Sequence, residues 1–464
     1  MLPTLGLLFG LKQRVTRKAY LGWGFALAAV KFAIDTAIVY GCTHKVWSPW
    51  GYLVPSLVLR QESVGAGPGV MHVLLVLMAL PFLWVGLSMS VRRAADAGLS
   101  PWIGVAFLVP GLNYLTIALL SLRGSKDNAE WTAPPMAPYR KAAAGDAPPE
   151  SVQVLPPSMR AAFLGILCSV GIGAAMLGLS VYGLGAYGMA LFFATPFSMG
   201  AAASWIYNAK HPRGLGSTIG VALLGTVLTG AMCLLFAVEG TICLIMALPI
   251  AAGLSVIGAI IAWSIASHTS STAPRALMLV LPTLALTEAK VAAPTLRDVT
   301  TSIEVDAAPE RVWPNVIGFS ELPAPPEWFF KLGVAYPMRA RINGAGVGAV
   351  RHCEFSTGPF VEPITVWNPP HHLAFDVTSQ PPSMTELSPY QSVKAPHLEG
   401  YMVSRGGEFR LTALPGGRTR IDGTTHYTLA IYPESYWVLF AEPLLHSIHG
   451  RVLSHIKNLS ERQP

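Results

Sequence analysis

Long apolar stretches dominate the first 290 residues of the chain. A helix that crosses a bilayer needs roughly 20 mainly apolar residues. Stretches of about that length lie at 19–40, 70–90, 101–122, 161–183, 187–206, 216–236 and 240–263. A further stretch at 276–287 is apolar but short, so it fits a re-entrant or interfacial segment as well as a span. This pattern predicts a multi-pass α-helical membrane protein.

The membrane part divides into two helical units. Residues 124–159 are polar and rich in Pro and Ala, a composition typical of a semi-extended linker. We therefore expect a first membrane domain over residues 1–123 and a second transmembrane helical unit over residues 160–290.

A soluble α+β domain is predicted over residues 296–464. Alternation from Val299 indicates a strand, Pro309 opens a helix, and a second short helix carries Trp328. Runs broken by Gly and Pro then predict antiparallel strands at 348–356, 360–367, 371–378, 400–412 and 418–431. From Glu434 to Arg462 apolar residues recur every three or four positions, as a helix laid across a sheet requires. We expect a curved antiparallel sheet closed by this long C-terminal helix.

Composition separates the two parts of the chain further. Only 12% of the residues are charged and 52% are hydrophobic, whereas soluble domains hold about 25% charged residues. Residues 1–295 contain 18 Lys and Arg against 9 Asp and Glu, and residues 296–464 contain 14 against 16. Because the basic excess falls in the loops of the apolar part, it indicates positive-inside topology. The bilayer is the expected partner, and nucleic acid is not.

A polar motif marks one membrane boundary. Asp96 lies within helical reach of Arg92 and Arg93, and Gly98 suits the left-handed position after a helix. Ser100, followed by proline, suits the start of the next helix, and Trp102 would lie at headgroup depth. The motif predicts that one helix stops and another starts here.

Residues 8–130 resemble a bacterial inner-membrane family, domain of unknown function 805. The motifs that carry the resemblance are Gln13 to Tyr20, Arg92 to Trp102 and Gly124 to Asn128. Gln13, Ala19 and Ala95 stand where the family usually has glycine, glutamate and histidine. The family has no settled activity, so the resemblance implies a place in the bacterial inner membrane and no particular reaction.

Topology follows from the positions of the basic loops. Lys12 to Lys18 place the N-terminus inside. The basic residues from Arg123 to Arg213 also fall inside if the stretch interrupted at 110–113 turns back, whereas strict alternation places them outside. We favour the turn. It makes the C-terminal domain cytoplasmic unless residues 276–287 span the membrane.

Residues 297–460 resemble the START and polyketide-cyclase-like superfamily (SRPBCC). The resemblance rests on the segments Ile303 to Trp313, Gly346 to Phe355, Trp367 to Asp376 and Gly416 to Tyr427. It implies a helix-grip fold with a cavity between sheet and closing helix for lipids, polyketides or other apolar molecules. The superfamily includes carriers and enzymes, so the fold leaves activity open.

Aromatic residues are the candidates for lining such a cavity, although a plain core would have the same composition. The candidates are Trp313, Phe329, Phe355, Trp367, Phe375, Trp437 and Phe440.

Residues that could carry chemistry are weaker candidates, and we assign no catalytic residue, metal or cofactor. His446 and His449 share a helix face, but no third metal ligand has diagnostic spacing. Glu354 with His352 and His426 could form an acid/base set.

Alternation gives the Glu354 set a different interpretation, which we favour. If Cys353 and Phe355 point inward, Glu354 points outward.

Two further features are interpreted without chemistry. Lys31 and Asp35 are interpreted as an intrahelical ion pair. The proline-rich loop 380–397 is a hypothetical lid or binding loop.

The leading functional hypothesis is a non-enzymatic, membrane-tethered module that binds a hydrophobic small molecule or lipid. The alternatives are a membrane-bound cyclase, dehydratase or hydrolase with an apolar substrate, and an envelope or transport component whose soluble domain binds protein partners.

Overall fold

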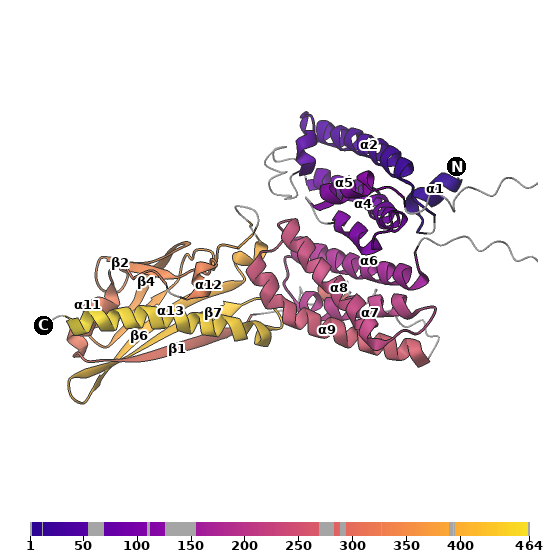
Figure 1. The fold of residues 1–464 in the computed structure, drawn as a ribbon. Coiled ribbons are helices and arrows are strands. Elements are labelled where there is room, and N and C mark those ends of the chain that lie inside the picture. Colours follow the sequence, from indigo (N-terminus) through magenta and orange to yellow (C-terminus); the bar gives the residue numbers. More distant parts are fainter. Residues whose placement is uncertain are drawn as a thin grey trace, which may run out of the picture. The chain divides into compact units, whose positions relative to one another are not determined.

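The computed structural model describes residues 2–11, 13–53, 69–108, 112–125, 155–268, 283–287, 294–325, 327–388, 393 and 395–462. The chain forms two compact units, residues 1–164 with 235–237, and residues 165–234 with 238–464 (Figure 1). Each unit is described by itself. Most of the predicted linker and most of the 276–287 stretch lie outside the described residues.

Helices form the first unit. Their bounds are α1 (Leu2–Phe9), α2 (Arg17–Thr43), η1 (Pro49–Leu53), α4 (Gly69–Asp96), η2 (Pro101–Leu108), α5 (Leu112–Leu122) and the start of α6 (Pro157–Leu177). The Thr16 side chain caps α2 by accepting from the Ala19 amide. The stretch predicted at 101–122 is divided between η2 and α5, which pack against each other. Each of these two helices is too short to cross a bilayer, as expected for a stretch that turns back.

Four helices in the described part of the chain are long and apolar enough to cross a membrane. They cover Arg17–Thr43, Pro157–Gly183, Leu215–Leu235 and Thr241–Ala266. Each corresponds to a predicted apolar stretch, so a membrane protein is confirmed. Which side of the membrane each loop faces stays a prediction.

The helices of the second unit pack closely through glycine. After α6 come η3 (Gly178–Gly183), η4 (Ala190–Ala194), α7 (Thr195–Asn208), α8 (Leu215–Leu235) and α9 (Thr241–His268). A Cβ atom on Gly200 of α7 would lie 1.9 Å from the Ser255 carbonyl oxygen of α9, and one on Gly258 would lie 2.0 Å from the Phe197 carbonyl oxygen. Small residues of this kind let membrane helices approach each other.

Replacing Gly200 with alanine is therefore expected to destabilise this unit. The new methyl group meets backbone, so relief requires α7 and α9 to move apart, at a cost of about 1–3 kcal/mol. Thermal unfolding of the full chain in detergent would measure the loss. Gly253→Ala on α9 is the matched control, because a Cβ atom there meets nothing within 4 Å. Equal melting of the two variants would contradict this packing.

A seven-stranded antiparallel sheet forms the C-terminal domain, also in the second unit. The strands are β1 (Leu296–Val305), β2 (Pro337–Asn343), β3 (Val350–Phe355), β4 (Gly358–Asn368), β5 (His372–Asp376), β6 (Met402–Leu414) and β7 (Arg418–Leu429), in the order β1-β7-β6-β5-β4-β3-β2. The sequence analysis predicts all of them except β2. In β2 the buried Ala340 and the core-packed Ile342 alternate with Arg339 and Arg341.

Helices close one face of this sheet. After β1 come α11 (Pro309–Ile317) and the short α12 (Trp328–Lys331), and the chain ends with α13 (Glu434–Arg462). Helix α13 runs along the sheet and packs against β1 and β7 (Figure 1). Its residues Val452, Leu453 and Ile456 are buried in the main core of the domain. The predicted helix-grip arrangement is confirmed.

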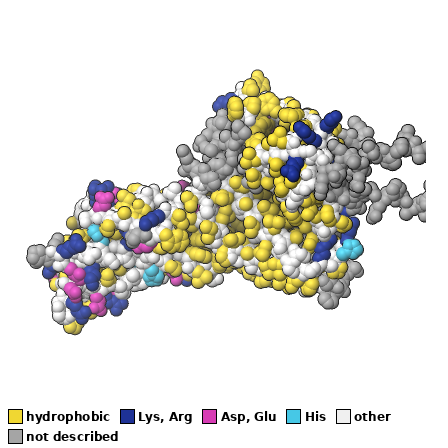
Figure 2. Space-filling model, in the orientation of Figure 1, with side chains coloured by type: hydrophobic (Ala, Val, Ile, Leu, Met, Phe, Trp, Pro, Cys, Tyr) yellow, Lys and Arg dark blue, Asp and Glu magenta, His cyan; other side chains and the backbone are white. Residues whose placement is uncertain are grey.

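Surface composition differs between the two parts of the second unit. In the face shown in Figure 2, charged side chains gather over the C-terminal domain, and hydrophobic side chains cover most of the helical part. On α9, Ile245 is 62% exposed and Ile257 is 49% exposed. Apolar surface of this kind suits contact with lipid.

Candidate functional site

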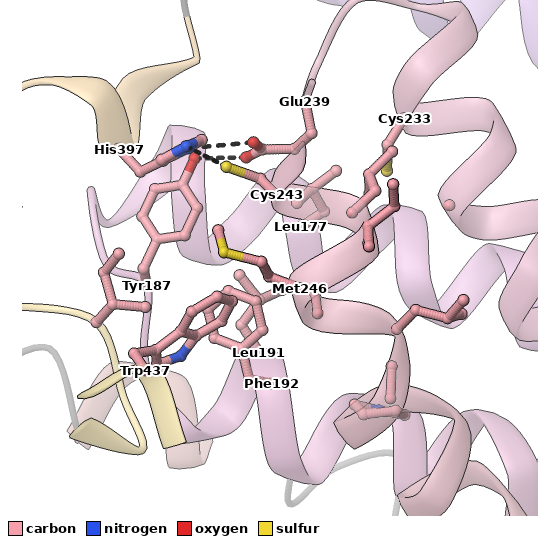
Figure 3. A pocket seen from close by; sticks show the side chains of 18 of the residues that line it. Leu177, Tyr187, Leu191, Phe192, Cys233, Glu239, Cys243, Met246, His397 and Trp437 are labelled. Carbon is pink, nitrogen blue, oxygen red and sulfur yellow. Dashed lines mark hydrogen bonds and ion pairs between the residues drawn. The ribbon is translucent and has the colours of Figure 1, made fainter. Parts of the chain in front are cut away.

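A cavity of about 420 Å³ lies where the helices of the second unit meet the C-terminal domain. We call it the junction cavity. Its walls are almost entirely apolar, and it is within the size range of ligand pockets. Figure 3 shows Trp437 of α13 against Leu191 and Phe192 of η4, with Met246 of α9 beside them. Its lining includes Leu177, Leu191, Phe192, Met199, Leu244, Met246, Met402, Trp437, Phe440 and Leu444.

Backbone hydrogen bonds fix the walls of the junction cavity. The loop that follows η3 runs beside the end of β7, where Tyr187 and Ile431 form a parallel bridge. The Tyr432 amide donates to the Tyr187 carbonyl at 2.8 Å, and the Tyr401 hydroxyl donates to the Gly185 carbonyl at 2.6 Å. At the start of α9, the Thr241 amide donates to the Leu387 carbonyl at 2.9 Å.

Four polar side chains meet at one end of this cavity, and we call them the junction cluster. They are Glu239 before α9, Cys243 in its first turn, Glu386 in the loop after β5, and His397 in the short helix η5 (Pro396–Leu398). The Cys243 Sγ atom lies 2.7 Å from Glu386 Oε1 and 2.9 Å from His397 Nε2. The other imidazole nitrogen, Nδ1, lies 3.1 Å from Glu239 Oε2. Figure 3 shows three of these side chains gathered above the apolar walls.

Three of the four side chains in the junction cluster are buried, and Cys243 is half-buried. Glu239, Glu386 and His397 are 7%, 5% and 9% exposed. Burial lowers the pKa of His397, but its hydrogen bonds with Cys243 and to the Glu239 and Glu386 carboxylates outweigh that effect and raise the pKa to about 12. The two carboxylates therefore favour the protonated imidazole.

Tyr187 extends this network. Its hydroxyl donates to Glu239 Oε1 at 2.7 Å. Burial, together with the Glu239 charge, raises the pKa of Tyr187, so the phenol keeps its proton and stays a donor.

Two kinds of chemistry use side chains of these types. Cys243, His397 and Glu239 have the connectivity of a nucleophile, its base and an orienting acid. Against that use, the Cys243 thiol donates to Glu386 Oε1 at 2.7 Å, a fourth contact that such a set does not need. Ligand atoms of Glu239, Cys243 and His397 also lie within 4.8 Å of one another, close enough to hold a metal ion.

A second cavity of about 200 Å³ lies inside the C-terminal domain, between the sheet and α13. We call it the inner cavity. Phe355, Phe375 and Phe409 line it, as do the paired side chains of Arg351 and Glu362. Burial raises the pKa of Glu362, and the adjacent Arg351 opposes that rise. The inner cavity is thus apolar with one buried ion pair.

The two cavities are neighbours. Four residues line both of them, namely Ser383, Met384, Met402 and Leu444. Side chains, two of them flexible methionines, separate the two spaces at this point. Methionine adapts to gaps of variable shape.

His449 on α13 lines the inner cavity and gives a testable pH dependence. Burial, together with the nearby His446, lowers the pKa of His449 to about 4. The unfolded chain takes up a proton below about pH 6.5, whereas the folded chain takes it up only near pH 4. The free energy of unfolding should therefore fall by about 2–3 kcal/mol between these values, after discounting for partial exposure.

Replacing His449 with glutamine should remove that part of the pH dependence. It also disturbs the hydrogen bonds of the imidazole with Thr301 and Thr425, so stability above pH 7 should fall by about 1–2 kcal/mol. Urea unfolding of the full chain at several pH values would measure it. His371→Gln is the control, because His371 is exposed. A His449→Gln protein with the wild-type pH profile would rule out the effect.

The predicted cavity aromatics are found in three places. Phe355 and Phe375 line the inner cavity, and Trp437 and Phe440 line the junction cavity. Trp313 and Trp367 pack against each other in the core, with ring centroids 5.7 Å apart. Phe329 packs against Trp328 and Phe330 and lines neither of the two cavities.

The predicted boundary motif is a buried polar clamp within the first unit. Arg92 and Arg93 are both 0% exposed, and Asp96 binds Arg93 and Arg14. Arg92 donates to the carbonyls of Leu7, Gln13 and Ser88, and Arg93 donates to those of Leu120 and Arg123.

The rest of the motif ends one helix and begins the next. Gly98 has a φ of 70°, as predicted for the position after a helix. Ser100 immediately precedes η2, and Trp102 in η2 is 37% exposed. The motif fastens helices together, which the sequence analysis does not predict.

Other candidate residues lie outside both cavities. Glu354 pairs with Arg339 and His426 with Asp298, each at 2.5 Å, on partly exposed surface. Buried Cys353 points into the core, so the outward interpretation of Glu354 is confirmed. Lys31 and Asp35 form the expected ion pair at 2.7 Å.

The junction cluster is not predicted from the sequence. One available signal is that Glu239 is the only acid between residues 160 and 287, with a cysteine four positions later. The predicted loop 380–397 does supply Glu386 and His397, although residues 389–392 and 394 lie outside the described residues.

Comparison with known proteins supports the assignment of the N-terminal part. Residues 8–133 match the family described as "Protein of unknown function (DUF805)". The predicted resemblance over residues 8–130 is thereby confirmed. A search of curated proteins found no match.

Solved structures similar to this chain cover about a third of it. Norcoclaurine synthase from Thalictrum flavum, in complex with a transition state analogue, is 14% identical, with a TM-score of 0.24; the match covers 36% of this chain and 96% of that one. The protein XoxI from Bacillus cereus is 17% identical, with a TM-score of 0.22; the match covers 35% and 93%. The activity named for norcoclaurine synthase belongs to that protein.

Proposed function

We propose that this protein binds an apolar molecule with a lipid-like chain in the junction cavity and passes it to the inner cavity of the C-terminal domain. The observation that carries the proposal is the set of four residues that line both cavities, Ser383, Met384, Met402 and Leu444. A path between the two cavities would run past these four side chains.

Cavity chemistry supports an amphipathic ligand. The apolar walls of the junction cavity suit a hydrocarbon chain, because burial of apolar surface contributes about 25 cal/mol per Å². The junction cluster at one end offers polar groups to a head group. In the inner cavity, Arg351 offers a cation.

Membrane placement supports access from the bilayer. Helices α6, α8 and α9 are long and apolar enough to span it, and all three contribute walls to the junction cavity. The proposal includes the bacterial inner membrane, with the C-terminal domain in the cytoplasm, on the grounds of the basic loops. It is a binding and transfer function without a covalent step.

A photoreactive fatty acid tests the proposal on the full chain in detergent. Peptide mapping of the wild type should find crosslinks both near η4 and in strands β3 to β5. Leu444→Trp fills the point where the cavities meet, so crosslinks in β3 to β5 should fall several-fold while those near η4 remain.

Leu439→Trp is the matched control, because Leu439 lies on the same helix and is 67% exposed. It should label like the wild type. Labelling of β3 to β5 that is unaffected by Leu444→Trp would mean that ligand does not pass between the cavities. Absence of labelling in both regions would reject the function altogether.

A further inference from the structure

We propose that Cys243, His397 and Glu386 bind a zinc-class metal ion at the polar end of the junction cavity, with Glu239 holding the imidazole in place. The metal would be bound by Cys243 Sγ, His397 Nε2 and an oxygen of Glu386. This site goes beyond the proposed lipid transfer and does not depend on it.

The donor atoms already lie together in the way that one ion requires. Sγ to Nε2 is 2.9 Å, Sγ to Glu386 Oε1 is 2.7 Å, and Nε2 to Oε1 is 3.5 Å. Zinc bond lengths of about 2.0–2.3 Å place tetrahedral ligand atoms about 3.3–3.6 Å apart. An outward movement of less than 1 Å by the thiol therefore produces the coordinating arrangement. Thiolate, imidazole and carboxylate are the ligand types that zinc takes in proteins.

Glu386 provides a second, independent observation. Its side chain is 0% exposed, yet its Oε2 atom is buried without a hydrogen-bond partner. A Cβ atom on Gly240 would lie 1.7 Å from that oxygen, so the glycine lets the start of α9 approach the carboxylate closely. Burial of a carboxylate with an unpartnered oxygen is costly unless a cation is bound to the group, and Oε1 is the oxygen that faces Cys243 and His397.

Glu239 has the position of an outer partner of a metal-bound histidine. Such histidines usually donate their second ring N–H to a carboxylate, which fixes the tautomer and the ring orientation. His397 Nδ1 lies 3.1 Å from Glu239 Oε2, and Tyr187 donates to the other oxygen of Glu239 at 2.7 Å. The chain of contacts from Tyr187 through Glu239 to His397 therefore orients Nε2 toward Cys243.

Three protein ligands leave one position of a tetrahedral zinc ion open. Sites with an open position bind water or a ligand oxygen, whereas purely structural sites have four protein ligands. Cys243 and His397 both line the junction cavity, and Figure 3 shows them at its end. The open position would therefore take an oxygen from water or from the head group of a bound molecule.

A bound metal explains why the Glu386 carboxylate lies beside the Cys243 sulfur. A role for Cys243 as a nucleophile does not explain it. The Cys243, His397 and Glu239 set alone could serve nucleophilic catalysis. A carboxylate 2.7 Å from the sulfur opposes formation of a free thiolate, but it is a natural co-ligand of a cation bound to that sulfur. The metal accounts for all four members of the junction cluster.

The test is metal content of the full chain, purified in detergent, stripped with chelator and then equilibrated with zinc. The wild type should retain one zinc ion per chain, and Cys243→Ser and His397→Gln should lose it. Glu239→Gln should keep the site with about 10–100-fold weaker affinity. Cys233→Ser, also in the junction cavity wall, and His446→Gln are matched controls that should bind as the wild type does.

Replacing zinc with cobalt gives a spectroscopic signal of the sulfur–metal bond itself, which a change in folding alone would not produce. The cobalt-loaded wild type should show a thiolate-to-metal charge-transfer band that Cys243→Ser lacks. A wild type that takes up no zinc, or whose uptake is unchanged in Cys243→Ser and His397→Gln, overturns the proposal. Isolation of Cys243 as a thioester would also overturn it, in favour of a nucleophile. Because zinc is measured without lipid, this failure is distinguishable from a failure of lipid transfer.

Discussion

Replacing Arg351 with methionine is expected to lower the free energy of unfolding of the C-terminal domain by about 3–5 kcal/mol. Arg351 is 2% exposed and forms an ion pair with Glu362. Its guanidinium also donates to the Ile317 carbonyl at 3.1 Å. Its loss leaves the Glu362 carboxylate buried without a counter-charge, which costs more than the pair itself contributes.

The aromatic rings around Arg351 explain why methionine would not simply fill the space. The guanidinium carbon lies 5.4 Å from the centre of the Phe375 ring and 5.7 Å from that of Phe409. Contacts of a cation with a ring face contribute up to about 2 kcal/mol when they are desolvated. Methionine retains contact with the rings but loses the charge.

Pulse proteolysis of the full chain in urea, following fragments of the C-terminal domain, would measure the loss. Arg339→Met is the matched control: its pair with Glu354 is about one third exposed and should contribute at most about 1 kcal/mol. The double variant Arg351→Met with Glu362→Leu should recover most of the loss. Similar stabilities for Arg351→Met and Arg339→Met would show that the buried pair is not required.

Replacing Asp96 with alanine is expected to destabilise the first unit by a similar amount, about 3–5 kcal/mol. The Asp96 side chain is 0% exposed and pairs with Arg14 and Arg93. Its removal leaves the Arg93 guanidinium, also 0% exposed, with only carbonyl oxygens to accept from it. The clamp between α4, the N-terminal segment and the end of α5 should loosen.

Thermal unfolding of the full chain in detergent would detect this loss. Ser125→Ala is the control, because the Ser125 hydroxyl donates to the same carboxylate at 2.6 Å and its removal deletes a single hydrogen bond, worth about 1–2 kcal/mol. If the Asp96→Ala and Ser125→Ala variants have the same melting temperature, the motif is not a structural clamp.

Periodicity is what made the fold predictable from the sequence. In helix α13, apolar residues recur every three or four positions. In most strands, apolar and polar residues alternate, and Gly or Pro marks the ends of the strand. Strand β2 escapes prediction because Arg339 and Arg341 occupy its outward positions and only Ala340 and Ile342 mark its inward face. Helices η2 and α5 lie within one apolar stretch, and the interruption at 110–113 is the sequence signal that predicts a turn between two shorter segments.

Contacts between distant segments are what the sequence could not provide. Glu239 and Cys243 are four positions apart, but Glu386 and His397 follow more than a hundred residues later. Only the fold brings the two pairs together. Similarly, Arg351 on β3 pairs with Glu362 on β4, and alternation within one strand does not reveal a partner on another.

Two neighbouring cavities and an apolar occupant are the centre of this account. Native mass spectrometry of the full chain, released from detergent without added ligand, tests it most directly. The account predicts a bound apolar molecule per chain, with lower occupancy in Leu444→Trp than in Leu439→Trp. A wild-type protein that carries only the mass of its chain and metal, and binds no added fatty acid or phospholipid, would contradict it.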